Sequence, residues 1–259
     1  MPTELSDGVH IYYEVDGRGP PLVLVPGFAT SLQGWKSYGY VDALRSDHQL
    51  ILIDPRGHGK SGKPHDSSSY ATQHRIRDVL VVLDALGIKS AHFLGYSYGG
   101  RIGFQLAKFA PERIKSAIIL SASARGRDFD SANPIRQHLE EGTEAVLGRI
   151  GQYAQLPTEM KAVFLANDIE ALIEANKAEM PDLEDDLSNM TMPFLILVGE
   201  NDRSHPCTEL QRVFKRLPDV TFVTLPGLDH TQAWYRSDIV LPHVRQFLLR
   251  VTSHERRAP

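Results

Sequence analysis

The chain has 259 residues, of which 42% are apolar and 23% charged, and this balance is typical of a globular protein that buries a full hydrophobic core. The formal net charge of −4 lacks the basic excess of nucleic-acid-binding proteins, so we expect no nucleic-acid partner. Cys207 is the only cysteine, which excludes an internal disulfide and argues against a cysteine-based metal site.

The sequence indicates neither a membrane span nor a secretory signal. No apolar run approaches the roughly 20 residues that cross a bilayer. The segment Met1–Asp7 has neither the basic start nor the apolar stretch of a signal peptide. A single cysteine also fits a reducing compartment. We therefore expect a cytoplasmic protein without a membrane partner, and the sequence indicates no particular oligomeric state.

Strand-like and helical patterns alternate from the start of the chain to about residue 124. Val9–Val15 alternates apolar and polar residues, which predicts an edge strand. Continuous apolar runs predict strands buried on both faces, at Leu22–Val25, Gln49–Ile53, Ala91–Leu94 and Ala117–Leu120. Helical spacing predicts helices over Ile76–Leu86 and Arg101–Ala110. This alternation indicates an α/β protein with a mostly parallel sheet covered on both faces.

The segment from residue 125 to residue 189 interrupts this alternation. It has no strand-like run, and residues 145–153 and 160–175 follow the pattern of amphipathic helices. Its acidic stretch, Glu179–Asp186, is interpreted as a solvated face. We predict a helical insertion between two strands. Strands and helices then resume at Phe194–Val198, Thr208–Leu217, Val220–Leu225 and Asp238–Val251.

A serine lies on a glycine-rich turn between a predicted strand and a predicted helix. Residues Gly95–Gly99 read G-x-S-x-G, with Ser97 at the centre. A serine in this context is held in a strained turn and presented at the tip of the sheet, beside the positive end of a helix. Ser97 is therefore a candidate nucleophile that needs a base and an orienting acid.

Two later loops carry an acid and a histidine. Asp202 lies just after the strand Phe194–Val198, and His230 just after the strand Val220–Leu225. In open α/β sheets, sites form beyond the carboxyl ends of the strands. Ser97, Asp202 and His230 all follow such ends, in the chain order Ser, Asp, His.

The chain resembles the α/β-hydrolase superfamily over nearly its whole length. The resemblance rests on Val23–Phe28, Asp54–Ser61, Gly95–Gly100, Gly199–Asp202 and Gly227–His230. It implies an α/β-hydrolase fold, with a mostly parallel sheet of about eight strands flanked by helices. It also implies a core of residues 1–124 and 190–259 and a helical cap of residues 125–189, inserted after the sixth strand. Pro26 stands where many members have histidine, and this change leaves the backbone donor two residues later unaffected.

The physical roles in a serine-based site follow from this placement. Ser97 attacks an acyl carbon, His230 accepts and later returns the proton, and Asp202 orients the imidazole. The backbone N–H groups of Tyr98 and Phe28 are the expected oxyanion hole.

Other residues compete for these roles. His205 lies in the same loop as Asp202 and is the nearest rival base, whereas His58 is expected to brace the loop after Ile53. Glu200 and Asp229 are rival acids. Some relatives carry the acid after the sixth strand, but Ser121–Ala124 contains none.

Four aromatic residues are candidates for substrate binding: Phe28, Tyr98, Trp35 and Trp234. Aromatic side chains also fill protein cores, and only Phe28 and Tyr98 gain support from their positions. The predicted cap offers further apolar side chains, namely Val146, Leu147, Ile150, Tyr153, Leu156, Met160, Val163, Phe164 and Leu165.

The function expected from these residues is hydrolysis of a small-molecule ester or lactone through an acyl-enzyme. This chemistry needs neither a metal nor an organic cofactor. Haloalkane dehalogenases and most epoxide hydrolases of this fold carry aspartate in place of Ser97, which argues against both activities. Carbon–carbon bond hydrolysis of β-diketone-like compounds, amide hydrolysis and perhydrolysis stay open, as does a ligand receptor that retains the triad.

Overall fold

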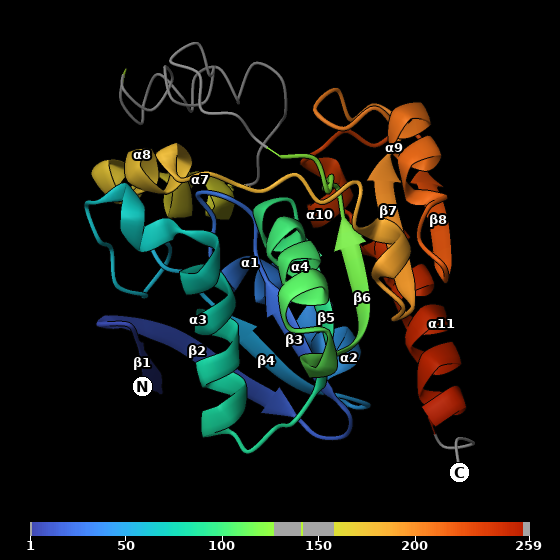
Figure 1. Ribbon diagram of the computed structural model, residues 1–259, viewed down its shortest axis with the longest axis horizontal. Helices are drawn as coiled ribbons and strands as arrows, with labels where there is room; N and C mark the ends of the chain where they lie inside the picture. Colours follow the sequence, from blue (N-terminus) through green and yellow to red (C-terminus); the bar gives the residue numbers. More distant parts are fainter. Residues whose placement is uncertain (1, 127–140, 142–157, 256–259) are drawn as a thin grey trace.

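The computed structural model describes residues 2–126, 141 and 158–255, and its centre is one mixed sheet of eight strands (Figure 1). The strand order is β1-β2-β4-β3-β5-β6-β7-β8. The strands are β1 (Thr3–Ser6), β2 (Val9–Gly17), β3 (Pro21–Val25), β4 (Gln49–Ile53), β5 (Ala91–Tyr96), β6 (Ile114–Leu120), β7 (Phe194–Gly199) and β8 (Val220–Leu225). From β4 to β8 every neighbouring pair is parallel, which confirms the predicted mostly parallel sheet.

The edge of the sheet differs from the sequence-based expectation. β2 pairs antiparallel with both β1 and β4, so the strand predicted at the edge is the second strand in the sheet. The edge strand β1 spans only Thr3–Ser6. Its four residues are too few to show a clear apolar period, which is why the sequence pattern missed it.

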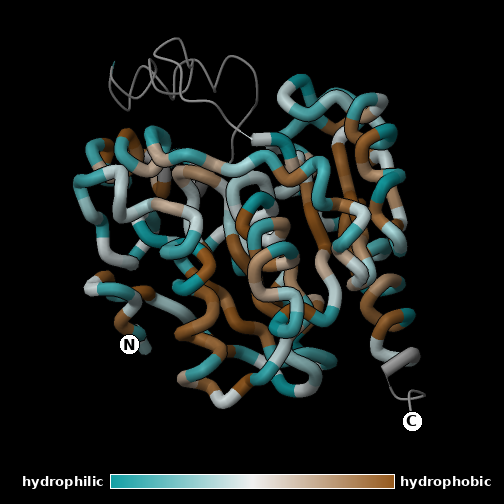
Figure 2. Tube along the Cα trace, viewed as in Figure 1, coloured by the Kyte–Doolittle hydropathy of each residue, from teal (hydrophilic) through white to brown (hydrophobic). Residues whose placement is uncertain are grey.

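Helices cover both faces of the sheet, and alternate residues of each strand point to opposite faces. Along β3, Val23 and Val25 belong to one apolar cluster, whereas Leu22 and Leu24 belong to the other. The first face is covered by α3 (Thr72–Ala85), α4 (Tyr98–Phe109) and α9 (Cys207–Phe214). The second is covered by α1 (Gln33–Ser37), α2 (Tyr40–Leu44), α10 (Gln232–Tyr235) and α11 (Ser237–Glu255). Figure 2 shows the apolar strands enclosed between these helices.

Buried polar groups anchor the loop that follows β4. Asp54 accepts hydrogen bonds from the backbone N–H groups of Leu32 (2.7 Å) and Lys60 (2.8 Å). Burial raises the pKa of the Asp54 carboxyl to about 6. Arg56 donates two hydrogen bonds to Asp78 on α3, of 2.8 and 2.6 Å, and both side chains are buried. These contacts fix the chain on both sides of the glycine-rich loop.

The segment between β6 and β7 contains α7 (Thr158–Leu165), α8 (Ile169–Lys177) and a short 3-10 helix, η3 (Leu187–Asn189). The side chain of Asp168 caps the first turn of α8 by accepting a hydrogen bond from Ala171 N (3.1 Å). Figure 1 shows α7 and α8 at the end of the molecule toward which the parallel strands point. The predicted helix over residues 145–153 lies outside the described residues, as do Val146, Leu147, Ile150, Tyr153 and Leu156.

Among the helices of the described ranges, none combines the length and apolar character needed to cross a membrane.

Candidate active site

Ser97 lies on the tight turn between β5 and α4, with φ 50° and ψ −108°. A positive φ is unfavourable for a residue with a Cβ, so the surrounding chain must enforce it. The Ser97 N–H donates to Leu120 O at the end of β6 (2.8 Å). A Cβ added at Gly99 would lie 2.1 Å from Val25 O, so only glycine allows α4 to pack this close to β3. The turn therefore holds the Ser97 hydroxyl beyond the end of β5.

His230 reaches Ser97 from the loop after β8. Its Nε2 lies 3.1 Å from Ser97 Oγ, within hydrogen-bond distance. The Tyr96 hydroxyl donates to His230 O (3.2 Å), and the Tyr96 ring lies beside the imidazole, with 5.4 Å between ring centroids. The residue just before Ser97 thus also holds the histidine loop in place.

Asp202 lies behind His230, in the loop after β7, and its side chain is fully buried. Its Oδ2 lies 2.8 Å from His230 Nδ1. Its Oδ1 accepts hydrogen bonds from the backbone N–H groups of Ser204 and His205, both 3.0 Å long. Burial alone would raise the pKa of Asp202, but the contacts with His205 and His230 outweigh it and hold the pKa below its usual value. Asp202 is therefore a carboxylate at neutral pH.

The acid loop and the histidine loop are joined directly by hydrogen bonds. Asn201 N donates to Leu228 O (2.8 Å), and Gly227 N donates to Glu200 Oε2 (2.8 Å). Because β7 and β8 are parallel neighbours in the sheet, these bonds fix the two loops relative to each other at the carboxyl ends of the strands.

The two rival acids are engaged elsewhere. Glu200 is exposed and binds the backbone of the histidine loop at Gly227. Asp229 Oδ1 accepts a hydrogen bond from Gln232 N (2.7 Å), and its own N–H donates to Gln232 Oε1 (3.0 Å). Asp229 therefore caps the start of α10.

The two expected oxyanion donors belong to segments next to Ser97. Tyr98 N is the first N–H of α4 and has no acceptor one turn earlier within the helix. The loop that carries Phe28 packs against the serine, since a Cβ added at Gly27 would lie 3.6 Å from Ser97 Cβ. The next residue, Ala29, is buried with φ 59°, and its carbonyl accepts a hydrogen bond from Asn167 Nδ2 (2.7 Å).

Asn167 was not singled out from the sequence, and no sequence signal marks it. It lies between α7 and α8, directly before the N-cap Asp168. Phe28 and Ala29 also pack against Leu172 on α8. The segment between β6 and β7 therefore supports the loop of Phe28, the expected oxyanion loop, through both a hydrogen bond and apolar contact.

The side chains of Phe28 and Tyr98 have different environments. Phe28 is partly exposed, and its ring meets those of His58 and Tyr98 edge to face, with centroids 5.4 and 5.9 Å away. The Tyr98 ring stacks on His58 and is only 4% exposed, so Phe28 offers the larger surface to a substrate. His58 is fully buried, with Nδ1 2.9 Å from Arg56 O, and burial lowers its pKa to about 4. It braces the loop after β4, as expected.

Trp35 and Trp234 do not have the surroundings expected of pocket residues. They are 0% and 1% exposed, and their rings pack edge to face, with centroids 5.5 Å apart. Trp234 also stacks on Tyr96, with centroids 4.7 Å apart. The prediction that both line the substrate pocket is therefore wrong: they fill the core beneath the site, where they support Tyr96.

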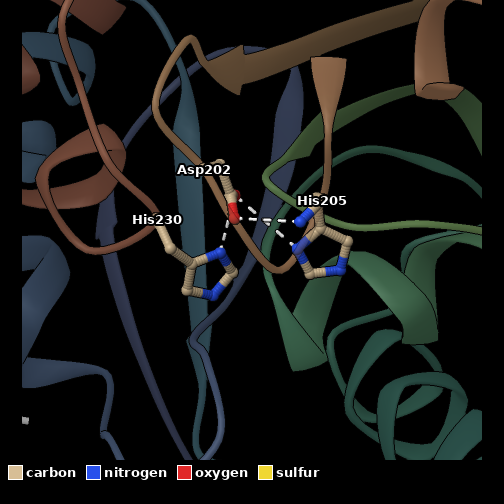
Figure 3. A group of neighbouring side chains, drawn as sticks. All are labelled: Asp202, His205 and His230. Carbon is tan, nitrogen blue, oxygen red and sulfur yellow. Dashed lines mark hydrogen bonds and ion pairs between the residues drawn. The ribbon is translucent and has the colours of Figure 1, made fainter. Parts of the chain in front are cut away.

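His205 lies on the other side of Asp202 from His230, and Figure 3 shows the two imidazoles directed at the same carboxylate. Its Nδ1 is 3.6 Å from Asp202 Oδ2, and its ring lies 5.2 Å from that of His230, nearly parallel to it. The structure thus brings His230, and not His205, into hydrogen-bond contact with Ser97.

The arrangement allows a proton to pass from Ser97 to His230. With Nδ1–H donating to the Asp202 carboxylate, Nε2 carries the lone pair and accepts the serine proton. The carboxylate then stabilises the imidazolium that forms.

Comparison with known proteins places the chain among proteins of the same architecture. The sequence profile described as the alpha/beta hydrolase fold matches residues 20–155. An enol-lactonase from Burkholderia xenovorans LB400 superposes with a TM-score of 0.85 and 25% identity, covering 96% of this chain and 100% of the lactonase chain.

Two of the relatives that align by sequence illustrate the similarity. A Bacillus subtilis protein named as a 2-succinyl-6-hydroxy-2,4-cyclohexadiene-1-carboxylate synthase is 28% identical over 88% of this chain and 90% of its own length. An Azorhizobium caulinodans protein named as a carbamate hydrolase is 37% identical over 50% of this chain, and the match spans 47% of that relative. Because the family profile matches more than half of the residues and the fold agrees throughout, the chain belongs to the alpha/beta hydrolase fold family.

Proposed function

We propose that this protein is a serine hydrolase that cleaves a carboxylic ester or lactone through an acyl-enzyme. The observation that carries the proposal is the continuous path from Ser97 Oγ to His230 Nε2 (3.1 Å) and from His230 Nδ1 to Asp202 Oδ2 (2.8 Å). A hydroxyl, an imidazole and a buried carboxylate in this order are what nucleophilic acyl transfer requires.

The proposed reaction has two halves. Ser97 Oγ attacks the acyl carbon while its proton passes to His230 Nε2, and the carbonyl oxygen becomes an oxyanion. The N–H groups of Phe28 and Tyr98 stabilise this oxyanion, and one such donor is worth about 3 kcal/mol in other enzymes. His230 then returns the proton to the leaving alkoxide oxygen, which leaves the acyl group on Ser97. Water attacks the acyl-enzyme by the same route and releases the acid.

The residues also support a small-molecule substrate. Phe28 offers an apolar, partly exposed ring beside the serine turn, and α8 packs against it. We propose that residues 125–189 form a helical cap over this end of the sheet. The similarity to an enol-lactonase over 96% of this chain favours cyclic esters among the acyl substrates to be tested.

The experiment compares Ser97→Ala with wild-type protein on p-nitrophenyl butyrate. We expect Ser97→Ala to lose at least about 1,000-fold in turnover, because the remaining groups provide no nucleophile. Ser123→Ala is the matched control, since this serine follows the neighbouring strand β6 and should leave the rate within about twofold. Equal rates for Ser97→Ala and wild type would refute the proposal.

A substrate panel then separates the reaction classes. Esters of graded chain length should show a burst of one released alcohol per active site, followed by steady turnover. Lactones should show steady turnover without this burst, because the ring alcohol stays attached to the acyl group. Turnover of β-diketones without any ester burst would instead assign carbon–carbon bond hydrolysis. A thermal shift with a ligand but no turnover of any substrate would assign a receptor.

A further inference from the structure

The loop after β7 places a second histidine against the acid of the proposed triad. His205 and His230 approach Asp202 Oδ2 from two sides, with Nδ1 atoms 3.6 and 2.8 Å from it (Figure 3). All three candidate ligand atoms lie within 4.8 Å of one another. No step of the proposed hydrolysis uses the His205 side chain.

His205 is held in this position by its own backbone. Its N–H donates to Asp202 Oδ1 (3.0 Å), and Pro206, the N-cap residue of α9, follows it directly. The side chain is only 16% exposed. Its Nδ1 has no hydrogen-bond partner among the described residues, because 3.6 Å to Asp202 Oδ2 exceeds hydrogen-bond distance. A largely buried ring nitrogen therefore faces a carboxylate without bonding to it.

The distances among the three side chains lie near the spacing of ligands around a zinc ion, and small side-chain movements would complete the fit. Zn²⁺ binds imidazole nitrogen and carboxylate oxygen at about 2.0–2.2 Å, so two ligands in a tetrahedral site stand about 3.4 Å apart. The separation of 3.6 Å between His205 Nδ1 and Asp202 Oδ2 is close to this value, and the 2.8 Å pair has to open by about 0.6 Å. Neutral imidazole suits zinc, and Asp and Glu carboxylates also serve as zinc ligands in proteins.

We propose that Asp202, His205 and His230 form an inhibitory Zn²⁺ site, with the three side chains as ligands and water in the remaining position. The metal takes the Nδ1 lone pair of His230, so the single N–H of the neutral ring moves to Nε2. That nitrogen then donates toward Ser97 Oγ and can no longer accept its proton. Zinc would thus stop acyl transfer without occupying the substrate site.

The predicted inhibition by zinc rests on the proposed hydrolase function, whereas the predicted binding of zinc is independent of it. The experiment therefore has two readouts on the full-length protein, freed of metal by EDTA and dialysis. The first is the rate of p-nitrophenyl butyrate hydrolysis as ZnCl₂ is titrated. The second is zinc binding to Ser97→Ala by titration calorimetry, which needs no turnover.

Three variants give the comparison. His205→Phe keeps an aromatic ring beside His230 without a ligand atom, and His205→Leu serves if the first does not fold. His65→Phe is the matched control, because His65 also lies near two carboxylates, Asp168 (2.9 Å) and Glu170 (3.2 Å), but in a different loop. Each variant is compared with its own metal-free rate.

We expect one zinc per chain in Ser97→Ala and reversible inhibition of the wild type, relieved by EDTA. Replacing His205 should raise the inhibitory zinc concentration at least tenfold and weaken binding in Ser97→Ala/His205→Phe equally, since even groups behind the ligands shift metal affinity by about 10–100-fold. The His65 variant should match wild type. Equal zinc sensitivity with and without His205 would overturn the proposal, as would failure of 1 mM zinc to inhibit an active enzyme. If zinc binds as expected but the protein is inactive on every ester, the metal site is supported and the proposed function is contradicted.

Discussion

Replacing Asp202 with asparagine should disable the site through hydrogen-bond geometry alone. Asp202 Oδ1 accepts from two backbone N–H groups, of Ser204 and His205. An asparagine must keep its single oxygen there, because turning the amide over would place its NH₂ against two donors. The amide NH₂ then faces His230 Nδ1, which must become an acceptor. The ring proton is forced onto Nε2, the nitrogen that faces Ser97.

The size of the effect follows from this tautomer. A base that carries its proton on the wrong nitrogen cannot accept one, and the same change in another serine hydrolase lowers kcat by about 10⁴-fold. This factor corresponds to about 5.4 kcal/mol of lost transition-state stabilisation. The fold should persist, because asparagine has nearly the same shape and retains both backbone hydrogen bonds.

The assay is steady-state hydrolysis of p-nitrophenyl butyrate, with thermal unfolding as the test of folding. Glu200→Gln and Asp229→Asn are the matched controls, since both acids are bonded away from His230. We expect these controls to stay within about threefold of wild type, as changes outside the reacting groups usually do. A folded Asp202→Asn protein that keeps more than a tenth of wild-type kcat would show that Asp202 does not set the tautomer of His230. A large loss in either control would indicate that the replaced residue, and not Asp202, is the orienting acid.

Three further predictions concern the groups that support the site. Asp78→Asn should lower the free energy of unfolding by about 3–5 kcal/mol, measured by urea denaturation, because it leaves the buried Arg56 guanidinium without its counter-charge. His58 has its pKa lowered from 6.5 to about 4, so only the unfolded chain takes up its proton between these values and the folded state loses stability as pH falls through this window. His58→Gln should remove up to about 3 kcal/mol of that loss between pH 7 and pH 4, measured by urea denaturation at each pH. The same pH dependence of the free energy of unfolding in both proteins would contradict this. Asn167→Ala removes the 2.7 Å bond to Ala29 O and should lower kcat about tenfold with little change in KM, whereas a change in KM alone would show that Asn167 does not position the oxyanion loop.

The sequence predicts the sheet and its helices well, because each strand from β3 to β8 is a short apolar run between polar loops. Parallel strands buried on both faces leave such runs, and turn residues mark their ends. The short edge strand β1 cannot be predicted in this way, because its pairing with β2 and not its own sequence pattern makes it extended. The edge position assigned to β2 was wrong for the same reason.

The positions of Ser97, Asp202 and His230 can be predicted because each follows a strand end, and topology brings strand ends together. Side-chain environments cannot be predicted in this way. Trp35 and Trp234 are large aromatic residues of the kind that line pockets, but the packing of α1 against α10 buries both. The bond from Asn167 to Ala29 joins residues 138 positions apart and leaves no local signal.

Locating the acyl group during turnover tests directly whether Ser97 is the nucleophile. Wild-type protein is mixed with p-nitrophenyl butyrate, quenched in acid within the burst and digested for mass spectrometry. We predict a butyryl group on the peptide that contains Ser97, at Ser97 itself. In a His230→Ala variant acylated by a more reactive ester, the adduct on Ser97 should last longer, because the base that activates water is missing. An active enzyme whose acyl group lies on another residue, such as Cys207, or that never carries one, would contradict the assignment of Ser97 as the nucleophile.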